Sequence, residues 1–169
     1  MPLTSALIKE IEQEAASTKK MLARVPEDKF DWRPHEKSMT LKQLSRHVAF
    51  LSEWAGFITQ TSELDFANNN LKRPEVNNTA DLLKVHEQGV RSSIDALQAT
   101  KDEDLEATWT LRNGAHVISE ATKAVTIRRM ALSHTYHHRA QLGVYLRLLD
   151  VPVPGMYGPS ADDLAQSNP

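Results

Sequence analysis

Residues 131–149 read ALSHTYHHRAQLGVYLRLL, and this stretch decides the predicted fold. Three histidines fall within five positions of a segment that is otherwise typical of a buried amphipathic helix. A buried imidazole needs a hydrogen-bond partner, a proton or a metal ion. The meaning of the cluster therefore depends on which helix face the rings occupy, and on whether another helix brings a partner.

Alternating steps of four and three residues predict one inward face on this helix. His134 and His138 lie one turn apart on that face, so both rings can reach a single point beside the helix. A histidine pair at this spacing is a common way to bind zinc, nickel, iron or copper, although most such pairs are surface residues or satisfied core groups. The predicted face consists of Ile127, Ala131, His134, His138, Gln141, Tyr145 and Leu148.

A second helix supplies a third histidine. We expect this helix over residues 40–60, because Thr40 and Gln43 have the spacing of a capping box. His47 falls on its inward face, and packed helices lie about 8–10 Å apart, close enough for rings from both helices to share one ion. The pattern therefore predicts a metal site made of His47, His134 and His138. The rest of that inward face is Leu44, Leu51, Trp54 and Ile58.

Other polar residues leave alternatives open. His137 lies about sixty degrees from His134 around the helix and could replace His138, although it drifts off the buried face. His86 also falls on an inward face and is a possible fourth ligand, but a hydrogen-bonded core histidine is the favoured interpretation. For Gln141 and Tyr145, structural hydrogen bonds are slightly favoured over a role beside the metal.

The whole chain shows four segments with helical periodicity, which predict an all-α four-helix bundle. Asn113-Gly114 within TWTLRNGAHVIS (108–119) is a strong hairpin signal, so we expect a small hairpin or extended excursion between the third and fourth helices. An Asn-rich polar connection is expected over residues 65–78. The four predicted helices cover residues 4–24, 40–60, 79–99 and 120–149.

Composition narrows the class of protein. The 169 residues suit a single domain over 1–169, and the net charge of −2, with both signs mixed, gives no footprint for nucleic acid or an anionic membrane surface. The absence of cysteine excludes disulfides, zinc thiolate sites and cysteine nucleophiles. The charged N-terminal segment is unlike a secretory signal, and no segment has the length and apolarity of a membrane span, so a soluble cytoplasmic protein is expected.

Two motifs resemble a known family. HTYHHRAQL (134–142), followed by YLRLLDVPVPGMYGPSADD (145–163), is similar to the C-terminal signature of the DinB/YfiT-like metalloenzyme superfamily. DWRPHEKSMTLKQLSRHVAFLSEW (31–54) resembles its second-helix region, with a Trp-x-Pro loop, a Ser or Thr cap and then Leu-x-x-His. Arg139 and Gln141 match the Arg and Gln of the signature, whereas Ala140 stands where the family often has Gly, which should only firm the helix.

The resemblance implies an up-down-down-up bundle, a homodimer, and a zinc or nickel ion held by His47, His134 and His138. Three histidines leave a coordination position for water or substrate. Because some members of the family that the chain resembles use a low-molecular-weight thiol such as bacillithiol or mycothiol, the first hypothesis is a metal-dependent transferase that activates such a thiol for transfer to an electrophile. The alternatives are a metal-dependent hydrolase that uses metal-bound hydroxide, and a non-catalytic protein whose bundle the ion staples together.

Overall fold

The computed structural model describes residues 1–68 and 73–167. Residues 69–72 of the expected polar connection and residues 168–169 of the tail lie outside the described part of the chain. The α-helices of the described residues are α1 (Leu3–Leu22), α2 (Leu41–Leu51), α3 (Trp54–Gln60), α4 (Thr79–Gln98), α5 (Lys123–Thr126), α6 (His134–Leu148) and α7 (Ala161–Ser167). Short 3₁₀ turns form η1 (Glu27–Lys29) and η2 (Asp102–Glu106), and a π-helix forms η3 (Ile127–Ser133).

The predicted all-α four-helix bundle is wrong, because the chain is an α/β structure with a mixed sheet. Within the described residues, β1 (Glu63–Asp65), β2 (Thr108–Asn113) and β3 (His116–Thr122) form a sheet in that order. β1 runs parallel to β2, and β2 runs antiparallel to β3. The predicted hairpin corresponds to β2 and β3. β1 was not predicted, because a strand of three residues is too short to show an alternating pattern. Its partner also lies more than forty residues along the chain.

The hairpin is tied to the body through both of its ends. Gly114 has a φ of 58°, a left-handed conformation that favours glycine, and its N–H donates to the Asp65 carboxylate at 2.8 Å. Trp109 is buried, and its indole N–H donates to the Thr61 hydroxyl at 3.0 Å. The sheet therefore closes one end of the helical core instead of projecting as a free excursion.

The predicted second helix is interrupted between α2 and α3, where the backbone of α4 approaches closely. A Cβ at Gly89 would lie 2.9 Å from the Glu53 nitrogen, so only glycine permits this contact. Ser93 satisfies the backbone at the break, because its hydroxyl donates to the Ser52 carbonyl at 2.6 Å and accepts from the Gly56 N–H at 3.0 Å. Periodicity alone could not reveal the break, since both halves keep the same buried face.

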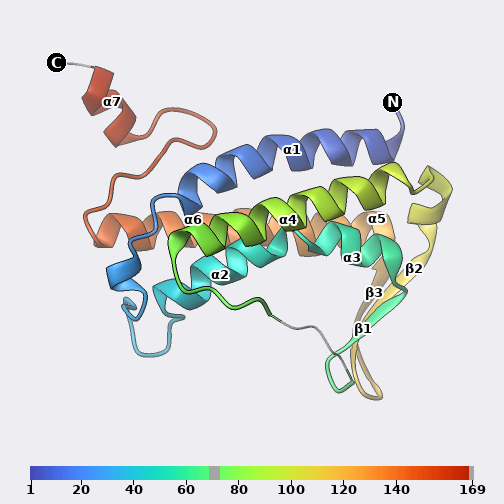
Figure 1. The fold of residues 1–169 in the computed structure, drawn as a ribbon. Helices are drawn as coiled ribbons and strands as arrows, with labels where there is room; N and C mark the ends of the chain where they lie inside the picture. The colour runs from blue at the N-terminus through green and yellow to red at the C-terminus, as the bar shows by residue number, and fades with distance from the viewer. Residues whose placement is uncertain (69–72, 168–169) are drawn as a thin grey trace.

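Figure 1 shows α1 and α4 running side by side along the length of the molecule, with α2 and α3 beside α4 and the sheet at one end. α6 packs against α2, which brings the second and fourth predicted helices together. The predicted fourth helix begins three residues late, at Lys123, because residues up to Thr122 belong to β3.

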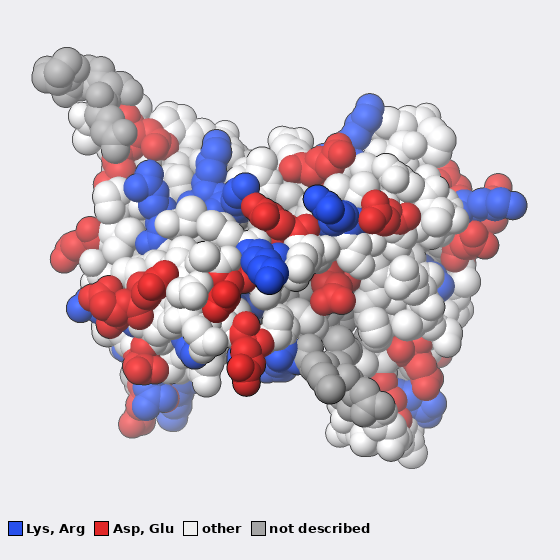
Figure 2. Space-filling view, in the orientation of Figure 1, with Lys and Arg blue, Asp and Glu red and all other residues white. Residues whose placement is uncertain are grey.

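The face shown in Figure 2 carries acidic and basic side chains interspersed, without a large area of one sign. Of the helices in the described ranges, none combines the length and apolarity that a bilayer crossing requires.

Candidate metal centre

His47 is placed by α2, whose start is fixed by the predicted capping box. The Gln43 N–H donates to the Thr40 hydroxyl at 3.2 Å, and the Thr40 N–H donates to the Gln43 side-chain oxygen at 2.9 Å. Leu44 and Leu51 are fully buried on the same side of the helix, whereas His47 is half-buried. The ring therefore lies at the edge of the core with access to solvent.

His134 and His138 lie in the first turns of α6, directly after the π-helix η3. A π-helix has more residues per turn than an α-helix and often occurs at functional sites. The extra residue shifts the buried face of α6, which is made by Arg139, Leu142 and Leu146.

The C-terminal half of the predicted inward face is therefore wrong at Gln141 and at Leu148. Gln141 and Leu148 are exposed, and Leu148 keeps 58% of its surface accessible. The N-terminal half is confirmed, because Ile127 and Ala131, which precede the shift in the sequence, are buried. The two histidines consequently lie at the border of the buried face, half-buried like His47.

The three predicted histidines converge. The Nε2 atoms of His47 and His134 are 3.3 Å apart. Ring centroids lie 4.9 Å apart for His47 and His134, 4.6 Å for His47 and His138, and 4.7 Å for His134 and His138. One nitrogen from each ring lies within 4.8 Å of the other two.

The donor set fits a divalent cation. Zinc–nitrogen bonds of about 2.0–2.1 Å in tetrahedral geometry place two ligand nitrogens about 3.3 Å apart, which matches the His47–His134 separation. His138 donates its Nδ1 proton to the Gln141 side-chain oxygen at 2.7 Å, and this hydrogen bond leaves its Nε2 lone pair available. The Nδ1 of His134 is buried without a hydrogen bond of normal geometry within the described residues.

Burial sets the charge state of His47. The pKa of this ring is lowered from its ordinary value to about 4, mainly by desolvation and then by the neighbouring rings of His138 and His134. The guanidinium groups of Arg73 and Arg46 act in the same direction. At neutral pH the ring is therefore neutral and offers a lone pair.

The other two rings behave alike. Burial is the main cause that lowers the pKa of His134, followed by His138, while the Met130 carbonyl opposes the shift. Burial also lowers the pKa of His138, and the hydrogen bond to Gln141 partly opposes it. All three imidazoles thus favour the neutral form that metal ligation requires.

The alternative histidines lie elsewhere. His137 is exposed and does not join the convergent group, although its ring centroid is 4.8 Å from that of His138. His86 is buried, donates from Nε2 to the Ala15 carbonyl at 3.0 Å, and has its Nδ1 3.0 Å from the Ser52 hydroxyl. The interpretation of His86 as a satisfied core histidine is confirmed.

Tyr145 has a structural environment. Its hydroxyl donates to the Met39 carbonyl at 3.2 Å, and its ring contacts Trp32 edge-on with centroids 5.6 Å apart. This contact fixes the loop before α2 against α6, so Tyr145 supports the helix that carries His47.

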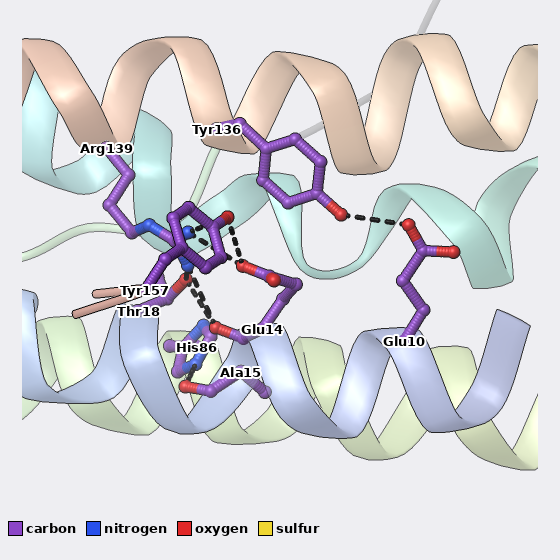
Figure 3. A network of polar contacts seen from close by, with 8 residues as sticks. All are labelled: Glu10, Glu14, Ala15, Thr18, His86, Tyr136, Arg139 and Tyr157. Atoms are coloured by element: carbon purple, nitrogen blue, oxygen red, sulfur yellow. Dashed lines mark hydrogen bonds and ion pairs between the residues drawn. The ribbon is translucent and has the colours of Figure 1, made fainter.

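Figure 3 shows a network of polar contacts that joins Arg139 of α6 to α1 and to the C-terminal segment. Arg139, only 2% exposed, donates to the Glu14 carboxylate at 2.7 Å, and also to the Thr18 hydroxyl at 3.0 Å. Its guanidinium also donates to the Tyr157 hydroxyl, which in turn donates to Glu14 at 3.0 Å. The role of Arg139 is therefore to fix α6 and the C-terminal segment to α1. The burial of Glu14 was not predicted, although Glu14 lies three residues after the buried Ile11 on the same face of α1.

Known proteins resemble this chain over most of its length. The family model described as the DinB family matches residues 1–168. An uncharacterized protein, YrdA, from Bacillus subtilis (strain 168) is 23% identical over 159 residues, covering 94% of this chain and 90% of the relative.

Solved structures of DinB-like proteins share the fold. The protein YjoA from Bacillus subtilis has a TM-score of 0.68 at 17% identity, covering 89% of this chain and 97% of that one. A protein from Bacillus cereus has a TM-score of 0.70 at 19% identity, covering 90% and 97%. A third structure, from Exiguobacterium sibiricum, has a TM-score of 0.67 at 21% identity, covering 89% and 93%.

Proposed function

The chain belongs to the DinB family, and on that premise we propose that His47, His134 and His138 hold one divalent metal ion, zinc or nickel. The observation that carries this proposal is the convergence of three neutral, half-buried imidazoles from two separate helices. Among the described residues, no further histidine or carboxylate joins the group. Three protein ligands are typical of catalytic zinc sites, which keep a position for water or substrate.

A bound divalent ion supplies Lewis-acid chemistry, since it lowers the pKa of a thiol or water that completes its coordination. The residues of the chain provide the rest. Gln141 orients the His138 ring, and burial keeps the rings deprotonated at neutral pH. Met39 and Phe50 line a cavity whose wall also includes His47, so a small molecule bound there would lie beside one of the three proposed ligands.

We propose a metal-dependent transferase that transfers a low-molecular-weight thiol to an electrophile. In this reaction the sulfur attacks the electrophilic atom, a leaving group departs with the electrons of its bond, and the thiol proton passes to solvent. The half-buried position of the histidines leaves them partly accessible to solvent, which the thiol and the electrophile both need in order to reach the ion.

The proposal is tested with a panel of small thiols and a chlorodinitrobenzene-like electrophile, with and without added zinc or nickel. The transferase proposal expects turnover that needs both the thiol and the ion, and that is lost in the His134→Ala variant. Turnover of an ester or amide without a thiol would favour the hydrolase instead. A stabilising effect of the ion on the melting temperature without any turnover would favour the stapling role and contradict the enzyme. The homodimer stays a prediction.

A further inference from the structure

A cavity of about 290 Å³ opens beside the candidate metal centre. His47 forms part of its wall, so a molecule bound in the cavity lies against one of the proposed ligand rings. The volume suits part of a small molecule better than a macromolecular surface. The lining residues are Met39, Gln43, Arg46, His47, Phe50 and Arg73.

Helix α2 provides most of this wall. Counted from Gln43, the residues Arg46, His47 and Phe50 follow at steps of three, four and seven, which places them along one side of a helix. The capping box holds the Gln43 side chain, and Phe50 is buried. The wall is therefore formed by a regular helix and exists before any ligand binds.

The charges at this cavity are unbalanced. Arg46 is half-buried and Arg73 is exposed, and within residues 1–68 and 73–167 neither has a carboxylate within the 4.0 Å of an ion pair. Arg139, by contrast, is fully paired in its network. Two guanidinium groups facing one small cavity without a counter-ion favour the binding of an anion.

We propose that the carboxylate or phosphate group of an anionic small molecule binds between Arg46 and Arg73, with the rest of that molecule directed along the cavity toward His47. Met39 and Phe50 provide an apolar wall for a short carbon chain. The identification of this molecule as the substrate rests on the proposed function, and it narrows the substrate class to a thiol or an electrophile that carries an anionic group.

The test measures binding of inorganic phosphate and of succinate, as two sources of the anionic group, to protein from which metals have been removed with a chelating resin. Dissolved chelators are avoided because they are themselves anions. We expect saturable binding of at least one probe by calorimetry. Arg46→Gln and Arg73→Gln should each weaken that binding about tenfold, since each removes a charge-assisted hydrogen bond.

Arg91→Gln is the matched control, because it removes the same charge at a residue that does not line this cavity. Arg91 is exposed on α4. Probe binding by this variant should equal that of the wild type. An equal loss in all three variants would overturn the proposal, as would unchanged binding in both cavity variants or the absence of saturable binding to the wild type.

A second measurement does not depend on the variants folding. The side-chain Nε–Hε signals of Arg46 and Arg73 in the wild-type NMR spectrum should shift as the probe saturates, while that of Arg91 should not. Saturation without these shifts would contradict the site.

The two proposals can fail separately. Anion binding through the arginines in a protein that takes up no zinc would contradict the metal centre and leave the anion site standing. Stoichiometric zinc uptake by a protein that binds neither probe would contradict the anion site and leave the metal centre standing.

Discussion

Helix α6 carries two polar clusters on different sides, and they are satisfied to different degrees. Arg139, on the buried side, reaches the Glu14 carboxylate together with two hydroxyl groups, so its charge is matched inside the protein. His134 and His138, at the border of the buried face, contact mainly each other and His47. The Nδ1 of His134 makes no hydrogen bond of normal geometry among the described residues.

The difference separates a cluster that stabilises the fold from a cluster that is suited to binding an ion. A buried network with matched partners stabilises one arrangement of helices, whereas a group of neutral imidazoles that face one another without a positive charge or a carboxylate is suited to an added cation. The same helix therefore fixes its own position through Arg139 and presents ligands through its histidines. Single substitutions can disrupt one of these clusters and leave the other intact.

The largest effect is expected from Arg139→Met in the metal-free protein. Removing the guanidinium leaves the Glu14 carboxylate buried without its partner, which should lower the free energy of unfolding by about 3–5 kcal/mol in urea denaturation. The double variant Glu14→Leu/Arg139→Met is the control and should recover most of the loss. A cost below about 1 kcal/mol for the single variant would show that the network does not stabilise the fold.

Gln141→Leu should lower the metal affinity of the histidine cluster without lowering the stability of the fold. Removing the acceptor for the His138 Nδ1 proton should weaken zinc binding about 10–100-fold, measured by competition with a chromophoric chelator. Gln141→Glu keeps an oxygen acceptor and should retain most of the affinity. Equal affinities for the wild type and the Leu variant would show that Gln141 does not orient this ring.

Acid should destabilise the metal-free protein through the histidine cluster. The pKa of His47 is about 4 in the folded chain against 6.5 as its ordinary value, so unfolding takes up a proton between these limits and stability falls as pH falls from 6.5 toward 4. Because the ring is half-exposed, solvent screening reduces the effect to about 1–2 kcal/mol.

Denaturation curves at several pH values between 4 and 7 measure this dependence. His47→Gln has no titrating group at this position and should show a shallower loss. A stability that is flat or rises as pH falls through this window would contradict a neutral histidine cluster.

The smallest effect is expected from Thr40→Ala at the start of α2. Loss of the capping box should cost about 1 kcal/mol of unfolding free energy and leave the buried face of the helix intact. Thr40→Ser keeps the hydroxyl and should behave like the wild type in the same thermal denaturation experiment. A cost in the Ser variant equal to that in the Ala variant would point to the methyl group instead of the cap.

The sequence predicted much of the site and less of the fold. Regular spacing found His47 and His134, because each lies within one turn of residues whose burial the pattern predicts correctly, and the four-residue step from His134 added His138. The β2–β3 hairpin had the Asn113-Gly114 signal, whereas β1 had none because its pairing depends on a distant strand. The shift of the α6 face could not be predicted, since no residue type marks the π-helix η3 in the sequence.

Long-range partners explain the remaining differences. Glu14 and Arg139 are 125 residues apart, and only the folded chain shows that the charge of one is matched by the other. Arg46 adjoins His47 and could have been noticed, but nothing in the sequence places Arg73 at the same cavity.

The central claim is that His47, His134 and His138 share one ion. Its most direct test is the metal content per chain, by elemental analysis and native mass spectrometry, of protein purified without a nickel column and then incubated with zinc. The account predicts one tightly held ion in the wild type, and almost none in His47→Ala, His134→Ala or His138→Ala, while His137→Ala remains fully loaded. Stoichiometric retention of the ion by all three ligand variants would contradict it.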